Sequence, residues 1–115
     1  MDKNQVMGIE EELKRTRTDK LENYVSTLAG IIHDLEVSEV LLSRSGTNHQ
    51  HISKQHPSYY FRDIHLKMGK HELCYYRKVS MYGKKESLKL DGQKITVADI
   101  YMLMHAFGSI ITHRK

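Results

Sequence analysis

Rings and cations recur through the second half of the chain in a pattern that could bind single-stranded nucleic acid. Such binding uses flat aromatic rings, on which bases stack, and cations, which contact the phosphates. In a strand, side chains two residues apart point to the same face of a sheet. If the segments between 59 and 90 are strands, one face carries seven candidates, with two lysines at an adjoining turn: Phe61, His65, Lys67, Tyr76, Lys78, Tyr82 and Lys89, then Lys84 and Lys85. The plainer alternative is that aromatic residues favour strands and that lysines keep an exposed face hydrated.

Two arginines interrupt the opposite, apolar face of the same predicted strands. Arg62 and Arg77 fall there among aliphatic side chains. They could pair with carboxylates such as Glu72 or Asp99, or they could bind an anion. A β-bulge would move them to the other face. We therefore include both arginines among the candidate nucleic-acid-binding residues.

Histidines are frequent, with eight in 115 residues, and three of them are close enough in sequence to suggest a metal site. His49, His51 and His56 lie in one loop, and His71 or Cys74 could add a ligand. Zinc sites with strong sequence signals instead pair two ligand clusters at fixed offsets. We therefore expect no metal and no cofactor.

A small basic nuclease is a further possibility. Its chemistry needs an acid and a base within hydrogen-bond reach of the scissile phosphate. His65, His71, Tyr76 and Arg77 could be gathered in this way, but no spacing between them requires it. Glycine-rich phosphate loops and the common hydrolase motifs do not occur in the sequence. We expect a protein without enzyme activity.

The charge of the chain changes near Gly46. Residues 1–46 carry 6 Lys and Arg against 9 Asp and Glu, whereas residues 47–115 carry 12 against 5 and hold six of the seven tyrosines. A basic half of this kind suits a polyanionic partner. The single cysteine cannot form an internal disulfide, and apolar stretches are too short for a membrane span. We expect an intracellular protein, cytoplasmic or nuclear, that does not associate with membranes.

The elements that must position these side chains follow from hydrophobic periodicity. Residues 1–42 have helical spacing, with one bent helix or two helices meeting near Thr18, and residues 43–58 form a loop. Alternation predicts strands over 59–68, 71–82 and 87–90, with a possible fourth strand at 93–95. Turns are expected at Gly69-Lys70, at residues 83–85 and at Asp91-Gly92. Thr96 then caps a final helix. We predict a single α+β domain: an N-terminal helix or helix pair, an antiparallel meander of three or four strands, and a C-terminal helix packed on one sheet face.

An apolar stripe in the N-terminal helix has the 4-3-4-3 spacing of a coiled-coil seam. Its members are Leu21, Val25, Leu28, Ile32 and Leu35. The stripe could be the core face of a helix that packs on its own sheet. The alternative, which we favour here, is a dimer or partner interface, because a C-terminal helix could already cover one face of the small sheet.

These patterns favour a non-catalytic nucleic-acid-binding protein that acts as a homodimer on a single-stranded or RNA ligand. The main alternative is a protein-interaction module, a small regulator or adaptor that engages another protein through its N-terminal helix. In that case the basic sheet would be ordinary solvated surface. The two readings differ in where the rings and lysines of the strands point.

Overall fold

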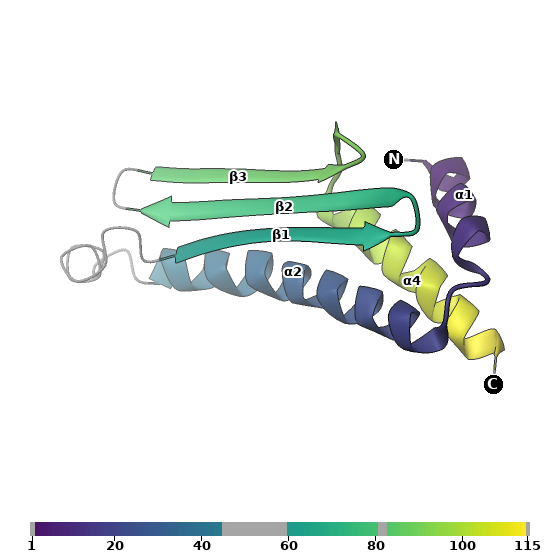
Figure 1. Ribbon diagram of the computed structural model, residues 1–115. Helices are drawn as coiled ribbons and strands as arrows, with labels where there is room; N and C mark the ends of the chain where they lie inside the picture. Colours follow the sequence, from purple (N-terminus) through teal and green to yellow (C-terminus); the bar gives the residue numbers. More distant parts are fainter. Residues whose placement is uncertain (1, 45–59, 81–82, 115) are drawn as a thin grey trace.

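The computed structural model describes residues 2–44, 60–80 and 83–114, and in this part of the chain it confirms the predicted α+β fold (Figure 1). The elements follow in the order α1 (Lys3–Leu13), α2 (Thr18–Arg44), β1 (Tyr60–Met68), β2 (His71–Ser80), β3 (Gly83–Leu90), β4 (Gln93–Lys94) and α4 (Val97–His113). The N-terminal helices are two, separated before Thr18, and α2 continues to Arg44, two residues beyond the expected end of the helical segment.

The strands form one antiparallel sheet in the order β1-β2-β3-β4, as the meander predicted. Gly69 and Lys70 connect β1 to β2, and Gly69 has the positive φ that this turn needs. Asp91 and Gly92 connect β3 to β4, both with positive φ, as in the mirror-image turns that suit hairpins. The expected turn at residues 83–85 is wrong, because β3 begins at Gly83 and its first residues already pair with the end of β2.

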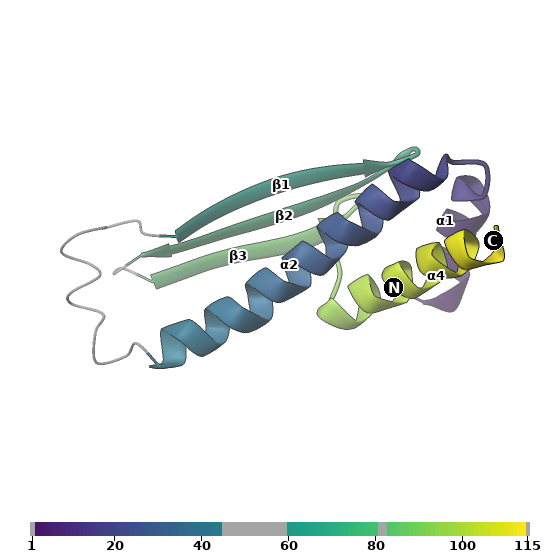
Figure 2. The same ribbon diagram turned by 90° about the horizontal axis from the view of Figure 1, so that it is seen from below.

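The helices described here lie on one side of the sheet (Figure 2). Helix α2 runs along that side, α4 packs against α2, and α1 packs against α4. Thr96 caps α4 as predicted: its hydroxyl accepts a hydrogen bond from the backbone N–H of Asp99, and the Asp99 carboxylate accepts one from the backbone N–H of Thr96. In the described ranges no helix has both the length and the apolar character that a membrane crossing requires.

The core lies between the sheet and this helix layer. Met68, Leu73 and Tyr75 of the sheet are fully buried and belong to one apolar cluster with residues of all three helices. The stripe of α2 is part of the same cluster: Leu21, Leu28 and Ile32 are buried, and Val25 and Leu35 are half-buried against them. Our expectation that α2 would lack an apolar partner inside its own chain was therefore wrong. One sheet face accommodates both α2 and α4, so the stripe serves as core.

Candidate nucleic-acid interface

The sheet face turned away from the helices, here called the outer face, carries most of the predicted binding residues. Burial alternates along the strands as the predicted parity requires. In β1, Leu66 and Met68 are buried whereas His65 and Lys67 are exposed. In β2, Val79 is buried whereas the neighbouring Lys78 is exposed. The seven outer-face candidates that the structure describes are Phe61, His65, Lys67, Tyr76, Lys78, Lys85 and Lys89.

Strand register gathers two rings and two cations at one end of the outer face, here called the aromatic end (Phe61, Tyr76, Lys78 and Lys85). Phe61 lies opposite Lys78, which in turn lies opposite Lys85 on the next strand. The rings of Phe61 and Tyr76 meet edge to face, with centroids 5.7 Å apart and planes at 87°. Phe61 is 57% exposed although it is a large apolar residue. The aromatic end therefore presents a ring to solvent beside two ammonium groups.

The other end of the outer face is more polar and partly acidic. His65 lies opposite Cys74, and its Nδ1 is 3.3 Å from the Cys74 Sγ. The other ring nitrogen of His65, Nε2, is 3.1 Å from Oδ1 of Asp63. Burial, together with a hydrogen bond from the thiol to Glu72, raises the pKa of Cys74, so this group is a thiol at neutral pH.

Cations outnumber carboxylates on the described strands of the outer face. Asp63 and Glu72 are its carboxylates, and its lysines are Lys67, Lys78, Lys85, Lys89 and Lys94. Lys94 was not among the sequence candidates, although it lies opposite Lys89. The face thus carries more cations than carboxylates, although Asp63 lies opposite Tyr76 beside the aromatic end.

Three of the predicted cations do not lie on the outer face. Arg77 is completely buried on the helix side, where its Nη1 is 3.2 Å from Oε2 of Glu86. Lys84 lies opposite the buried Val79 and so belongs to the same side. Arg62 also faces the helices, 3.6 Å from the Asp34 carboxylate of α2. Including Arg77 among the binding residues was wrong, because a buried guanidinium cannot contact a ligand.

Asp34 explains why charged and polar groups occur on the helix side of β1 and β2. Its carboxylate accepts a hydrogen bond from the buried Tyr75 hydroxyl and lies beside the Arg62 guanidinium. Burial, and then the hydrogen bond to Asp34, raise the pKa of Tyr75. The Arg62 guanidinium therefore has a structural partner on α2 that the sequence did not suggest.

Four other predicted residues lie outside the described part of the chain. They are Tyr82 and the three weak metal candidates His49, His51 and His56.

The residues considered for a nuclease site are divided between the two faces of the sheet. His65 and Tyr76 belong to the outer face, whereas His71 and Arg77 belong to the helix side. The sheet therefore separates the groups that would have to act on one phosphate.

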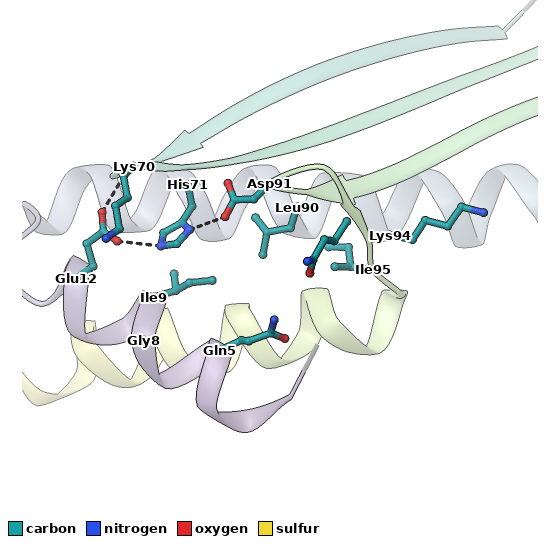
Figure 3. A pocket seen from close by; sticks show the side chains of 11 residues that line it. Gln5, Gly8, Ile9, Glu12, Lys70, His71, Leu90, Asp91, Lys94 and Ile95 are labelled. Carbon is teal, nitrogen blue, oxygen red and sulfur yellow. Dashed lines mark hydrogen bonds and ion pairs between the residues drawn. The ribbon is translucent and has the colours of Figure 1, made fainter.

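His71 instead connects α1 to the sheet at the edge of a hollow of about 460 Å³ (Figure 3). Its Nε2 is 2.8 Å from Oε2 of Glu12, and its Nδ1 is 2.6 Å from Oδ2 of Asp91. Glu12 also accepts a hydrogen bond from the backbone N–H of Lys70. Both ring nitrogens of His71 are thus occupied by carboxylates, which suits a structural link between elements.

Comparison of the chain with protein-family models, with curated proteins and with solved structures finds no match.

One arrangement on the outer face was missed although the sequence contains a signal for it. A two-residue turn at Gly69-Lys70 fixes the register of β1 and β2, so that Met68 lies opposite His71. Counting outward from this pair places His65 opposite Cys74. Cys74 was considered only as an additional ligand for the loop histidines, and its cross-strand neighbour His65 was not considered with it.

Proposed function

We propose that this protein binds a single-stranded nucleic acid, DNA or RNA, across the outer face of its sheet and performs no chemistry on it. The observation that supports the proposal most strongly is the aromatic end, where Phe61 and Tyr76 stand beside Lys78 and Lys85. Bases of a single strand can reach a ring, whereas bases inside a duplex are already stacked on each other. Phosphates on either side of a stacked base would meet the lysines.

Base stacking and phosphate contact contribute to the binding free energy in different ways. Stacking on an aromatic side chain contributes about 1–3 kcal/mol per base and tolerates any base. Each phosphate contact releases counterions, so its contribution falls as salt concentration rises. The rest of the face adds Lys67, Lys89 and Lys94, which extend the positive surface along the strands. We therefore expect moderate affinity, strong salt dependence and little sequence preference.

In this proposal, one copy of the chain binds the nucleic acid. The stripe expected to form a homodimer is largely buried in the core, so it would have to leave the core to meet a second copy. The homodimer stays a prediction, and light scattering of the purified protein tests it. In the described part of α2, the same burial removes the stripe from the surface that a protein-interaction module would use. An intracellular location also belongs to the proposal, since nucleic acid is the partner.

Fluorescence anisotropy with labelled oligonucleotides tests the proposed function. Single-stranded DNA, single-stranded RNA and a duplex of equal length are titrated at two salt concentrations. The proposal predicts that a single strand binds more tightly than the duplex and that raising the salt weakens the binding. Equal binding of duplex and single strand, or no binding at low salt, would overturn it. Cleavage of the oligonucleotide would show a nuclease instead.

A further inference from the structure

Three potential metal ligands lie together on the outer face, in strands β1 and β2. The ligand atoms of His65, Glu72 and Cys74 are all within 4.8 Å of one another. We propose that these three residues bind a zinc ion and leave a fourth coordination position open. This inference does not depend on nucleic-acid binding.

The separations of the Cys74 sulfur from the other two ligand atoms are close to those of a tetrahedral zinc site. Zinc lies about 2.3 Å from a thiolate sulfur and about 2.0–2.2 Å from nitrogen or oxygen ligands, so tetrahedral angles place sulfur about 3.6 Å from either neighbour. The Sγ of Cys74 is 3.3 Å from Nδ1 of His65 and 3.5 Å from Oε1 of Glu72. Since the ligand atoms of His65 and Glu72 also lie within 4.8 Å of each other, side-chain rotation could bring all three to one ion.

Asp63 supplies the second contact that metal-binding histidines ordinarily make. A ligating imidazole usually donates its other N–H to a carboxylate, which fixes the tautomer and the direction of the metal-binding nitrogen. Nε2 of His65 lies 3.1 Å from Oδ1 of Asp63, and this contact leaves Nδ1 directed toward Cys74. Asp63 is thus a positioning residue for His65 and not a ligand.

The local charges also favour a divalent cation. When the Cys74 thiol gives its proton to solvent, the thiolate, Glu72 and Asp63 place three negative charges together. Lys89, which lies opposite Cys74 on β3, offsets one of them. A zinc ion neutralises the remaining two. Since three protein ligands hold the ion, water or another ligand can take the fourth position, as in zinc sites with an open position.

Cobalt substitution tests this site, because Zn²⁺ itself has no d–d spectrum. The reduced full-length protein is titrated with Co²⁺, and the sulfur-to-cobalt charge-transfer band is recorded. Because the chain has one cysteine, that band can come only from Cys74. The proposal predicts a band that saturates at one equivalent and disappears when Zn²⁺ is added. Absence of the band from the wild-type protein would overturn it.

Variants then identify the other ligands. His65→Ala should weaken Co²⁺ binding at least tenfold, Glu72→Gln should also weaken it, and Asp63→Asn should weaken it about 10- to 100-fold through His65. The matched control is His105→Ala, which removes an exposed histidine of α4. A second control replaces His49, His51 and His56 with alanine. Both controls should retain the wild-type band, whereas its loss in either control, or an unchanged Co²⁺ affinity of His65→Ala, would refute the assignment.

Discussion

The ring of Phe61 on β1 contacts the ring of Tyr76 on β2 edge to face, with their centroids 5.7 Å apart. The contact is diagonal, because Phe61 lies opposite Lys78 whereas Tyr76 lies opposite Asp63. Edge-to-face packing fixes both rings without burying Phe61, which remains 57% exposed. The pair therefore forms a rigid platform on the outer face, beside the lysines that would contact phosphate.

Removing either ring should weaken binding of single strands. Phe61→Ala and Tyr76→Ala each remove a ring or the neighbour that holds it, so each should cost about 1–3 kcal/mol, or roughly 5- to 150-fold in affinity. The duplex should be affected less. Anisotropy titrations measure both. Tyr101→Ala is the matched control, since Tyr101 is 49% exposed but lies on α4. An equal loss in the control would contradict stacking on the outer face.

The placement of the outer-face residues could be predicted because strand parity depends on local sequence alone. Alternation placed Phe61, Tyr76 and Lys78 on one face, and the structure has them there. Thr96 and the Asp91-Gly92 turn were predictable for the same reason, since caps and tight turns involve neighbouring residues.

The features that could not be predicted from the sequence depend on contacts between distant segments. From the sequence, the stripe of α2 could be a core face or an interface. The packing of α2 beside α4 decides between these alternatives. Arg77 is buried because Glu86 on the next strand lies beside it, a pairing that requires the β2–β3 register. Because a turn was predicted at residues 83–85, the pairing of β3 with the end of β2 was not predicted.

Gly69→Ala should destabilise the protein. Gly69 has a φ of +65°, and a Cβ there would lie 2.7 Å from Oε1 of Glu12 and 3.2 Å from Cδ2 of Leu13. The left-handed backbone alone costs an alanine about 1 kcal/mol, and displacing Glu12 from the Lys70 N–H adds to it. Urea unfolding should therefore show a loss of about 1–3 kcal/mol.

A second glycine of the same region serves as the control. A Cβ at Gly8 of α1 would meet no atom within 4 Å. Gly8→Ala should therefore stabilise the protein by about 0.5–1 kcal/mol, as expected for a helical glycine. The account of the β1–β2 turn fails if Gly69→Ala proves as stable as the wild type.

Asp91 should make the stability of the protein sensitive to acid. A hydrogen bond from His71, and then one from the backbone N–H of Glu72, hold the pKa of Asp91 below its usual value. Its contribution is therefore complete above the unfolded pKa of about 3.9 and is lost as the pH falls through the lower folded pKa. Urea unfolding of the wild type and Asp91→Asn should show the full difference at about pH 5 and above, and the difference should shrink below about pH 3. A difference that stays constant over this range would show that the carboxylate charge is unimportant.

Glu86→Gln should cost more stability than loss of an exposed ion pair. The Arg77 side chain is fully buried, and its Nη1 lies 3.2 Å from Glu86, whose side chain is 33% exposed. Neutralising Glu86 weakens the compensation of a buried charge, with an expected loss of about 1–3 kcal/mol. The control is Glu11→Gln, which breaks an exposed helical pair with Lys14 and should cost no more than about 0.5 kcal/mol. Comparable losses in the two variants would argue against a structural role for the buried arginine.

The salt dependence of single-strand binding in Lys85→Ala and Lys84→Ala tests the outer face most directly. These neighbouring lysines of β3 carry the same charge but belong to opposite faces, Lys85 opposite Lys78 and Lys84 opposite the buried Val79. If phosphate lies on the outer face, Lys85→Ala should reduce the slope of log K against log salt by about 0.7, the loss of one contact to a single strand, and Lys84→Ala should leave it unchanged. Equal slopes in the two variants, or a larger change in Lys84→Ala, would contradict the proposed interface.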